Sequence, residues 1–376
     1  MFWFSLVMIF LAITGGFLML WRIPLVDHPS EIATAEPHLT PSDLIVIIPA
    51  YNEAERISPL LRSLLEQEGV DRACFVVVDD HSSDQTAQIA SDMGFRVIVS
   101  DPRRPGWIGK SRACWSGARS AVCRYLMFLD ADTRLEGPDS LRQLVTAYQS
   151  AGDSGIVSVQ PWHEIHRAYE NLSALFNIIV MAGISTFTPW GRKIRGAGAF
   201  GPCLICRQDQ YMQAGGHERI RGFVMDDLAL SEAFADHGLP TVCLGGRRVI
   251  RFRMYPEGIR SLVEGWTKNF GTAAGSTHPL VFTLIIAWIS GGFSTTALLI
   301  RSILIGPPWQ FAAAMALCLV YYGQLLWHSR RTGSFHPMAL ILYPLHSLFF
   351  TGLFMWSLYL TKIKRRVSWR GRSIDV

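Results

Sequence analysis

The chain has 376 residues, of which 49% are hydrophobic and 17% charged, and its formal net charge is +5. This length allows one sizeable domain plus membrane segments, and the apolar content argues against a wholly soluble protein. The basic residues lie beside the apolar stretches, so we expect a membrane surface, and not nucleic acid, as the anionic partner. Seven scattered cysteines, an odd number, argue against a disulfide framework.

Residues 1–22 predict a membrane anchor. Phe2 to Trp21 is almost uncharged and reaches the roughly 20 residues that span a bilayer. Arg22 follows this stretch, so the positive-inside rule places the next domain in the cytosol, at the cytoplasmic membrane. Residues 23–41, rich in Pro, Ala and Thr, predict a linker.

Strands and helices alternate in the part of the chain that follows. Apolar runs predict strands over residues 44–48, 75–78, 96–99 and 125–129, and helical spacing predicts a helix over residues 55–66 and another capped by Ser83. This alternation predicts a parallel sheet with right-handed crossovers. No G-x-G-x-x-G follows the first strand and no P-loop occurs, which argues against dinucleotide binding.

Acidic and amide side chains follow the predicted strands instead. They are Asn52 and Glu53, then Asp79 and Asp80, and then Asp130 and Asp132. Ligand sites in open α/β sheets collect at the carboxyl ends of strands, and two crowded carboxylates call for a compensating cation. Mg²⁺ or Mn²⁺ carrying a diphosphate meets this need, and the alternative is a solvated turn with a helix-capping aspartate.

Several motifs resemble a known family. Residues 46–53, 78–84 and 128–132 resemble, in order and spacing, the nucleotide-sugar half of the family 2 glycosyltransferases. Residues 109–114, 158–163, 199–202, 215–217 and 252–268 resemble the branch that glycosylates 4,4'-diaponeurosporenoate in bacterial carotenoid biosynthesis. The resemblance runs from about residue 44 to the carboxyl end. It implies an α/β fold of the GT-A type, with a mixed, mainly parallel sheet over residues 42–270 and transmembrane helices at both ends.

The resemblance also implies roles for single residues. Asp80 would bind uracil, Asp132 would ligate Mg²⁺ or Mn²⁺, and Asp130 would lie against the ribose or the ion. Pro49, Ala50, Asn52 and Glu53 would line the nucleotide, and Lys110 would lie near the donor or its diphosphate. From the residues alone, Lys110 is more often a solvated surface charge, and only its place in the motif makes a phosphate contact an equal alternative. His163 and His217 are interpreted as structural histidines.

The acceptor half is predicted from two further motifs. Asp227 would be the general base that deprotonates the acceptor, and the adjacent Asp226 is the alternative, because both also suit a helix start. Trp266 and Lys268 are placed on the acceptor side. They stand where processive synthases carry Gln-x-x-Arg-Trp, and this departure favours a single sugar transfer.

The carboxyl-terminal part is predicted to be membrane-bound over residues 280–361. Apolar runs cover residues 280–300, 304–327 and 338–360, while the apolar stretch between residues 169 and 189 is interpreted as a core or interfacial helix. The basic tail, residues 362–376, prefers the cytosol. Four simple crossings would place it outside, so the last run is expected to be re-entrant or interfacial.

Together these features predict a membrane-bound inverting hexosyltransferase. It would move a hexose, in the first place glucose, from a UDP-sugar to an apolar acceptor dissolved in the membrane. The acceptor we expect is a carotenoid acid, which would give a glycosyl ester. The alternatives are another lipid acceptor, such as a polyprenyl phosphate, a hopanoid or diacylglycerol, or a non-catalytic membrane scaffold that retains the fold.

Overall fold

The computed structural model forms two compact units, one comprising residues 24–162 and 198–253 (the sheet unit) and one comprising residues 1–23, 163–197 and 254–376 (the helical unit). The structure describes residues 2–26, 38–102, 105–108, 110–194, 196–273, 275–364, 366–369 and 372–375, and gives side chains for all of these except 192, 268–273, 366–369 and 372–375. Most of the predicted linker, Gly109 and the side chains of the basic tail beyond residue 364 lie outside this description.

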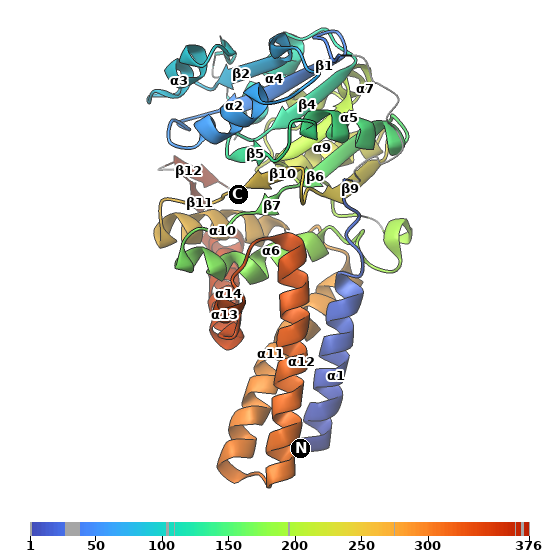
Figure 1. Cartoon of the computed structure of the whole chain (residues 1–376), viewed down its shortest axis with the longest axis vertical. Coiled ribbons are helices and arrows are strands. Elements are labelled where there is room, and N and C mark those ends of the chain that lie inside the picture. The colour runs from blue at the N-terminus through green and yellow to red at the C-terminus, as the bar shows by residue number, and fades with distance from the viewer. Residues whose placement is uncertain are drawn as a thin grey trace. The chain divides into compact units, whose positions relative to one another are not determined.

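The sheet unit is built on a seven-stranded mixed sheet with the order β3-β2-β1-β4-β8-β6-β9 (Figure 1). The first four strands run parallel, and β8 is antiparallel to both β4 and β6. The strands are β1 (Leu44–Ala50), β2 (Phe75–Asp79), β3 (Arg96–Val99), β4 (Tyr125–Leu129), β6 (Ile156–Gln160), β8 (Cys203–Arg207) and β9 (Thr241–Gly245). The predicted α/β class is confirmed, and four of these strands coincide with the predicted ones to within two residues.

Helices cover both faces of this sheet. Val46 and Ile48 of β1 belong to the core on the side of α2 and α5, whereas Ile47 belongs to the core on the side of α4 and α9. A strand that is buried on both faces has no polar positions, which explains the unbroken apolar run. The helices and short strands of the unit are α2 (Ile57–Leu65), α3 (Thr86–Asp92), α4 (Ser111–Arg119), β5 (Thr133–Leu135), α5 (Ser140–Ser150), β7 (Trp162–His163), α7 (Gln208–Gln213), α8 (Gly216–Arg219), α9 (Asp226–Ala235) and β10 (Ile250–Phe252).

The predicted cap of α3 by Ser83 is wrong, because Gln85 is the residue that precedes the helix and its side chain makes no cap hydrogen bond. α3 begins at Thr86, and the carboxylate of Asp84 accepts hydrogen bonds from the Thr86 amide (3.0 Å) and hydroxyl. The amide of Ser83 donates to Asn52 Oδ1 (2.8 Å) and is part of the loop. A carboxylate is the stronger acceptor, so the first turn forms on the aspartate.

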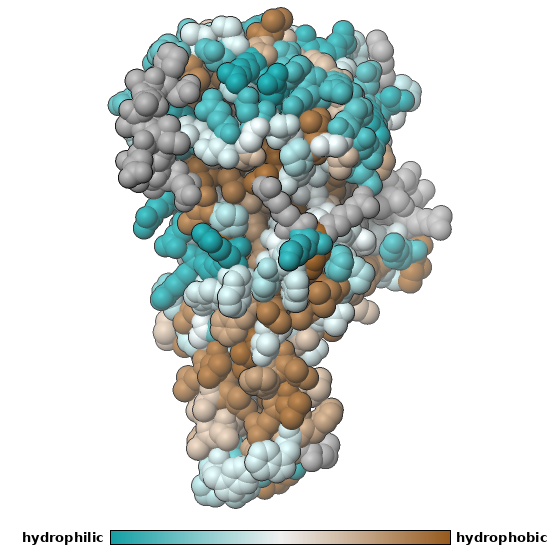
Figure 2. Space-filling model, turned by 90° about the vertical axis from the view of Figure 1, so that its right-hand side faces the viewer, coloured by the Kyte–Doolittle hydropathy of each residue, from teal (hydrophilic) through white to brown (hydrophobic). Residues whose placement is uncertain are grey.

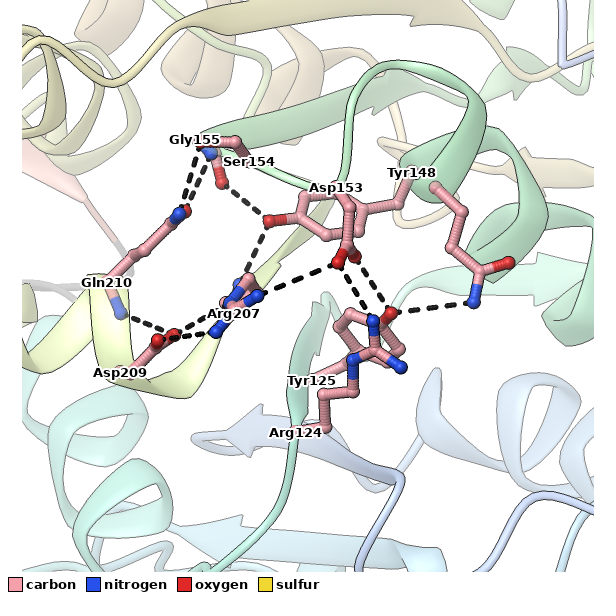
Figure 3. A network of polar contacts seen from close by, with 10 residues as sticks. Arg124, Tyr125, Tyr148, Asp153, Ser154, Gly155, Arg207, Asp209 and Gln210 are labelled. Carbon is pink, nitrogen blue, oxygen red and sulfur yellow. Dashed lines mark hydrogen bonds and ion pairs between the residues drawn. The ribbon is translucent and has the colours of Figure 1, made fainter.

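A polar network joins the amino end of β4 to the carboxyl end of β8 (Figure 3). Asp153 accepts from Arg124 (2.9 Å) and from the hydroxyl of Tyr125 (2.8 Å), and it lies 3.6 Å from Arg207. The Arg207 amide donates to the hydroxyl of Tyr148 at 3.2 Å. These contacts lie at the sheet edge opposite the carboxyl ends of the parallel strands, so they hold the fold.

We expect Gly155, in the same network, to tolerate no side chain. Its φ is +78°, and a Cβ there would lie 1.9 Å from the carbonyl oxygen of Pro240. Gly155→Ala should therefore cost about 3 kcal/mol or more of unfolding free energy. The control is Gly152→Ala, where φ is +114° and no atom lies within 4 Å, and which should cost about 1 kcal/mol. Thermal unfolding of the detergent-solubilised variants measures both, and equal losses would contradict the steric reason.

Among its described residues, the helical unit contains three helices that are long and apolar enough to cross a membrane: α1 (Phe2–Met19), α11 (Pro279–Ile305) and α12 (Pro308–Thr332). Figure 2 shows the hydrophobic surface that apolar side chains form on the long helices. The other elements of the unit are a 3₁₀ helix (Ala168–Ser173), α6 (Ala174–Gly183), a second 3₁₀ helix (Gly191–Lys193), α10 (Ile259–Ala273), α13 (Pro337–Leu340), α14 (Tyr343–Leu358), a π-helical turn (Tyr359–Lys364), β11 (Arg366–Trp369) and β12 (Arg372–Asp375).

Helix α1, the predicted membrane anchor, packs closely against α11 and α12. A Cβ on Gly16 would lie 2.5 Å from Trp288 and 2.6 Å from Gln324, so the helices approach closely at this glycine. The Gln324 amide donates to the Ile13 carbonyl (2.7 Å), and Arg331 donates to the Leu20 carbonyl (2.9 Å). Polar side chains of α12 thus donate hydrogen bonds to backbone carbonyls within α1 and just after its end.

The helical unit also includes stretches that were predicted to belong to the catalytic domain. Residues 163–197 and 254–270 fall within the predicted range 42–270, yet they cluster with the membrane helices. The reason is aromatic packing, because Phe176 of α6 stacks on Trp266 of α10 (4.9 Å between ring centroids) and contacts Phe350 of α14. With ten residues, α6 is too short to span a bilayer, as expected for a core helix.

Candidate active site

The carboxyl ends of β1, β2 and β4 meet at one edge of the seven-stranded sheet, because β1 pairs in parallel with β2 on one side and with β4 on the other. The Asp80 amide donates to the Ala50 carbonyl (2.8 Å), which joins the ends of β1 and β2 directly. The structure thus brings together at this edge the residues predicted to follow the strands: Asn52, Glu53, Asp79, Asp80, Asp130 and Asp132.

Asp80 is a buried carboxylate that is held by three donors. Its Oδ1 accepts from Ser100 Oγ (2.8 Å) and from Nε (2.9 Å) and Nη2 (2.7 Å) of Arg112. Both side chains of this ion pair are less than a tenth exposed, so the guanidinium compensates a charge that would otherwise be costly to bury. The sequence alone predicts no role for Arg112, which belongs to α4 (Ser111–Arg119).

The loop after β1 is fastened to the loop after β2. Asn52 adopts a φ of +52°, and its backbone amide donates to Ser82 Oγ (3.0 Å). The backbone amide of Glu53 donates to Thr86 Oγ1 (2.8 Å). Pro49 and Ala50 lie within β1 and are buried. Any contact of these two residues with a nucleotide would therefore involve their backbone, and the predicted nucleotide roles stay predictions.

Lys110 forms an ion pair with Asp130 and also donates to the Gly201 carbonyl at 3.0 Å. Burial alone would lower the pKa of this lysine, but the carboxylates of Asp130 and Asp226 outweigh burial and raise it, so the ammonium is charged. Only a quarter of its side chain is exposed. The interpretation as a solvated surface charge is wrong, and Lys110 supplies the positive charge beside the acidic turn.

Asp226 and Asp227 begin α9, next to the same glycine. A Cβ on Gly201 would lie 3.3 Å from both Asp227 Oδ2 and Lys110 Nζ. The carboxylate and the ammonium therefore lie beside the same glycine. Burial, with help from Asp226, raises the pKa of Asp227 to about 7, although Lys110 opposes the shift. A carboxylate with such a pKa is suited to accept a proton near neutral pH.

The acidic turn after β4 suits a divalent cation with few protein ligands. The amide (3.1 Å) and hydroxyl (2.7 Å) of Thr133 both donate to the Asp130 carbonyl, which fixes the turn carrying Asp132. Within the described residues no three or more His, Cys, Asp or Glu side chains are grouped to hold a metal. Mg²⁺ prefers a coordination shell in which two protein carboxylates are joined by oxygen atoms of a bound ligand, and Mn²⁺ accepts the same donors.

The two predicted structural histidines are buried. His217 lies 2.8 Å from the Tyr211 hydroxyl, and His163 lies 2.9 Å from the Asn177 amide. Burial lowers the pKa of each to about 4, so both are neutral at pH 7. Their contacts agree with a structural role.

The two predicted acceptor-side residues lie in α10 of the helical unit. Trp266 is 3% exposed, and its indole donates to Ser173 Oγ (3.0 Å). This burial indicates that Trp266 packs inside the helical unit, whereas the side chain of Lys268 lies outside the described residues. An acceptor contact by either residue stays a prediction.

A cavity of about 240 Å³ lies beside Arg112, lined by residues of α4, of α8 and of the segment after β3. Its lining was not predicted and comprises Asp101, Pro102, Pro105, Trp107, Arg112, Trp115, Arg119, Glu218 and Arg221. Among its lining residues, Arg112 also contacts Asp80 of the candidate active site.

Comparisons with known proteins agree with this geometry. The model of the family described as glycosyl transferase family 2 matches residues 45–198. The 4,4'-diaponeurosporenoate glycosyltransferase of Staphylococcus aureus strain USA300 is 35% identical over 335 residues, covering 89% of this chain and 88% of that protein. The protein of the same name from strain MRSA252 is 34% identical over the same shares.

One solved structure extends the comparison to the fold. A mannosyltransferase from Pyrobaculum calidifontis, in complex with GDP-Man and Mn²⁺, is similar with a TM-score of 0.53 and 16% identity, covering 96% of this chain and 98% of that one. At this identity the likeness concerns the fold, and the expected GT-A fold with helices at both ends is confirmed.

Proposed function

Because this chain belongs to glycosyl transferase family 2, we propose that it moves a hexose, in the first place glucose, from a UDP-sugar to a carotenoid acid dissolved in the membrane. Family membership makes the chain a glycosyltransferase, and the donor, the sugar and the acceptor are our proposal. The observation that carries it is the convergence of Asp80, Asp130, Asp132, Lys110 and Asp227 at one sheet edge.

For the donor, Asp80 would accept the imide N–H of uracil. Arg112 and Ser100 hold this carboxylate in one orientation through three hydrogen bonds to its Oδ1. A fixed acceptor that meets the donor face of a base discriminates against bases that lack the N–H, because a buried partner would then be left unpaired. Asn52 and Glu53 would line the same nucleotide.

For the diphosphate, Lys110 and the two carboxylates of the acidic turn supply complementary charges. Lys110 is held by Asp130 and the Gly201 carbonyl, so its ammonium is positioned before the donor arrives. When bound by Asp132 and Asp130, Mg²⁺ or Mn²⁺ would stabilise the negative charge that develops on the leaving diphosphate. Preorganised charge of this kind is commonly the largest single term in catalysis.

The proposed reaction is a single displacement that inverts the anomeric carbon. A new bond forms between the acceptor oxygen and this carbon while its bond to the UDP oxygen breaks. Asp227 would accept the proton of a hydroxyl acceptor, with Asp226 as the alternative base. A carboxylate acceptor brings no proton to remove.

For the acceptor, the relatives from Staphylococcus aureus are named for 4,4'-diaponeurosporenoate. Helices α1, α11 and α12 would hold the enzyme in the cytoplasmic membrane, where such an apolar acid dissolves. Arg22 after α1 and the basic tail favour a catalytic domain that faces the cytosol and its soluble donor.

A lipid with a hydroxyl group, such as a hopanoid or diacylglycerol, is the second candidate acceptor. The specific observation in its favour is Asp227, since a carboxylate with a pKa near 7 is useful only when a proton must be removed. The scaffold alternative is set aside, because the chain belongs to a family of enzymes.

The test is to incubate membranes containing the protein with labelled UDP-glucose and to extract the labelled lipid. We expect a product that absorbs visible light and releases its sugar in mild base, because an ester is hydrolysed there and a glycoside is not. A base-stable product would replace the carotenoid acid with a hydroxyl lipid. Label that remains in UDP-glucose, with each candidate lipid supplied, would contradict the proposed donor.

A further inference from the structure

We propose that α13 and α14 form a re-entrant hairpin, which enters the membrane from the side where α12 ends, turns near the bilayer midplane and returns to the same side. Its partner is the acyl chains of a single membrane leaflet. The inference rests on the crossing of the membrane by α1, α11 and α12 proposed above, and it fixes the side on which the chain ends.

The hairpin is too short to cross. α13 has 4 residues and α14 has 16. At 1.5 Å per residue α14 is about 24 Å long, whereas the hydrocarbon core is about 30 Å thick. The π-helical turn that continues α14 carries Lys362 and Lys364, which belong at a membrane surface. Among the described helices, only α1, α11 and α12 have the length and composition of a span.

The first residue of α14 lies at the middle of the long helices. The hydroxyl of Tyr343 is 3.0 Å from Thr295 Oγ1, near the middle of α11, and its ring centroid is 5.1 Å from that of Tyr321, near the middle of α12. Tyr322 donates to the Pro337 carbonyl at the start of α13 (3.0 Å). The chain leaves α12 at Thr332. It has therefore returned to the level of the middle of α12 before α14 begins.

The other end of α14 lies against α10. Ser357 donates to the Thr267 carbonyl of α10, the helix that precedes α11 in the chain. α10 also carries Arg260 and Glu264, whose side chains are 93% and 40% exposed, so this level is in contact with water. Since α11 and α12 cross in opposite directions, α11 begins on the side where α12 ends. In Figure 1, α13 and α14 accordingly reach only part of the way along the α11–α12 pair.

The outer face of the hairpin is apolar and its inner face carries polar groups. The exposed side chains are Met338, Ile341, Leu342, Leu345, Leu348, Met355 and Trp356. His346, Ser347 and Ser357 are buried against the rest of the unit. A helix in water shows the reverse arrangement. An apolar surface of this extent, continuous with that of α11 and α12, is fitted to lipid.

The charge pattern agrees with a return to the same side. Arg330 and Arg331 lie in the last turn of α12, and Lys362 and Lys364 follow α14, whereas Gly306 and Pro307 between α11 and α12 carry no charge and Arg301 is the single basic residue near that end. The positive-inside rule places both basic flanks in the cytosol. Three crossings then suffice, and the carboxyl-terminal tail lies in the cytosol.

Reporter insertion tests this topology in the full chain. Alkaline phosphatase, active only outside the cytosol, is inserted after Gly306 in one protein and fused after Val376 in another, and a fluorescent protein that folds in the cytosol replaces it in a matched pair. We expect phosphatase activity only after Gly306 and fluorescence only after Val376. Phosphatase activity at both positions would show that α14 crosses and would overturn the proposal.

A depth measurement distinguishes re-entry from a shallow surface position. Spin labels are placed on Leu345→Cys, Leu348→Cys or Met355→Cys in protein in which Cys123, the cysteine that is not buried, is changed to Ser. In vesicles we expect the label at 345 to be the deepest and that at 355 the shallowest. A crossing helix would be deepest near its centre, and a surface helix would give three equal, shallow depths, and either result would overturn the hairpin.

Discussion

Asp132→Asn is expected to lower sugar transfer by about 10²- to 10³-fold or more while the protein remains folded, because it removes charge stabilisation from the leaving group. Asp132 is half-buried at the end of β4, outside the hydrophobic core. We propose Asp132 as the main protein ligand of a divalent ion at this edge, beside Asp130, which pairs with Lys110. The measurement is the initial rate with saturating Mn²⁺ and, separately, the affinity for UDP with and without the ion.

The matched control for this variant is Asp236→Asn. Asp236 is an exposed aspartate that pairs with Arg219 on the surface of the sheet unit, so its replacement should leave the rate within about twofold, since exposed ion pairs contribute little. A metal-dependent gain in UDP affinity should be lost in Asp132→Asn and kept in the control. If Asp132→Asn retained that gain, the metal would have to be held elsewhere.

The part of the fold that the sequence predicts best is the half that carries the nucleotide. β1 and β4 are covered on both faces, so each is an unbroken apolar run that stops where its strand reaches the ligand edge. The polar residue that follows each run is therefore found without knowledge of any contact. This is why Asn52, Asp80 and Asp130 could be placed together at one edge.

The charges that hold these residues could not be predicted in the same way. Arg112 contacts Asp80 across 32 positions, and Lys110 donates to a carbonyl 91 positions away. Neither spacing leaves a periodic signal, because the partners are brought together by the order of the strands and not by a local turn. The sequence places Lys110 at a helix start, where an exposed and a buried position look alike.

The hydrophobic pattern of the sequence also does not predict the division into two units. α6 and α10 read as parts of an amphipathic or globular domain, since neither is long enough to span. Their side chains Phe176 and Trp266 nonetheless stack on each other and pack against α14. Aromatic residues bury large areas wherever a partner is offered, so composition alone does not tell which core they join.

Asp227→Asn is expected to separate the two candidate acceptors. A general base contributes about 10²- to 10⁴-fold when it removes a proton from a hydroxyl group. A carotenoid acid has a reference pKa near 4 and is already an anion at pH 7, so it needs no base. With a carboxylate acceptor the variant should lose less than about tenfold. With a hydroxyl acceptor its loss should approach that of Asp132→Asn.

The pH dependence gives an independent readout of the same residue. Burial raises the pKa of Asp227 to about 7, and only the ionised form accepts a proton. With a hydroxyl acceptor the wild-type rate should therefore fall as pH drops below about 7, and this limb should be absent from Asp227→Asn. The folded state also holds the proton more tightly than the unfolded state between pH 4 and 7, so stability from this group declines as pH rises through that range. Asp227→Asn should then unfold at an equal or higher temperature at pH 8.

That stability result is what makes a loss of activity interpretable. A variant that is as stable as the wild type and binds UDP normally has lost chemistry and not structure. If such a variant is as inactive as Asp132→Asn, the acceptor is a hydroxyl lipid. If it is nearly as active as wild type, Asp226→Asn must be measured too, because the adjacent carboxylate begins the same helix and lies close enough to Lys110 to influence its pKa. Mild losses at both positions, together with a product that mild base cleaves, are the combination that only a carboxylate acceptor explains.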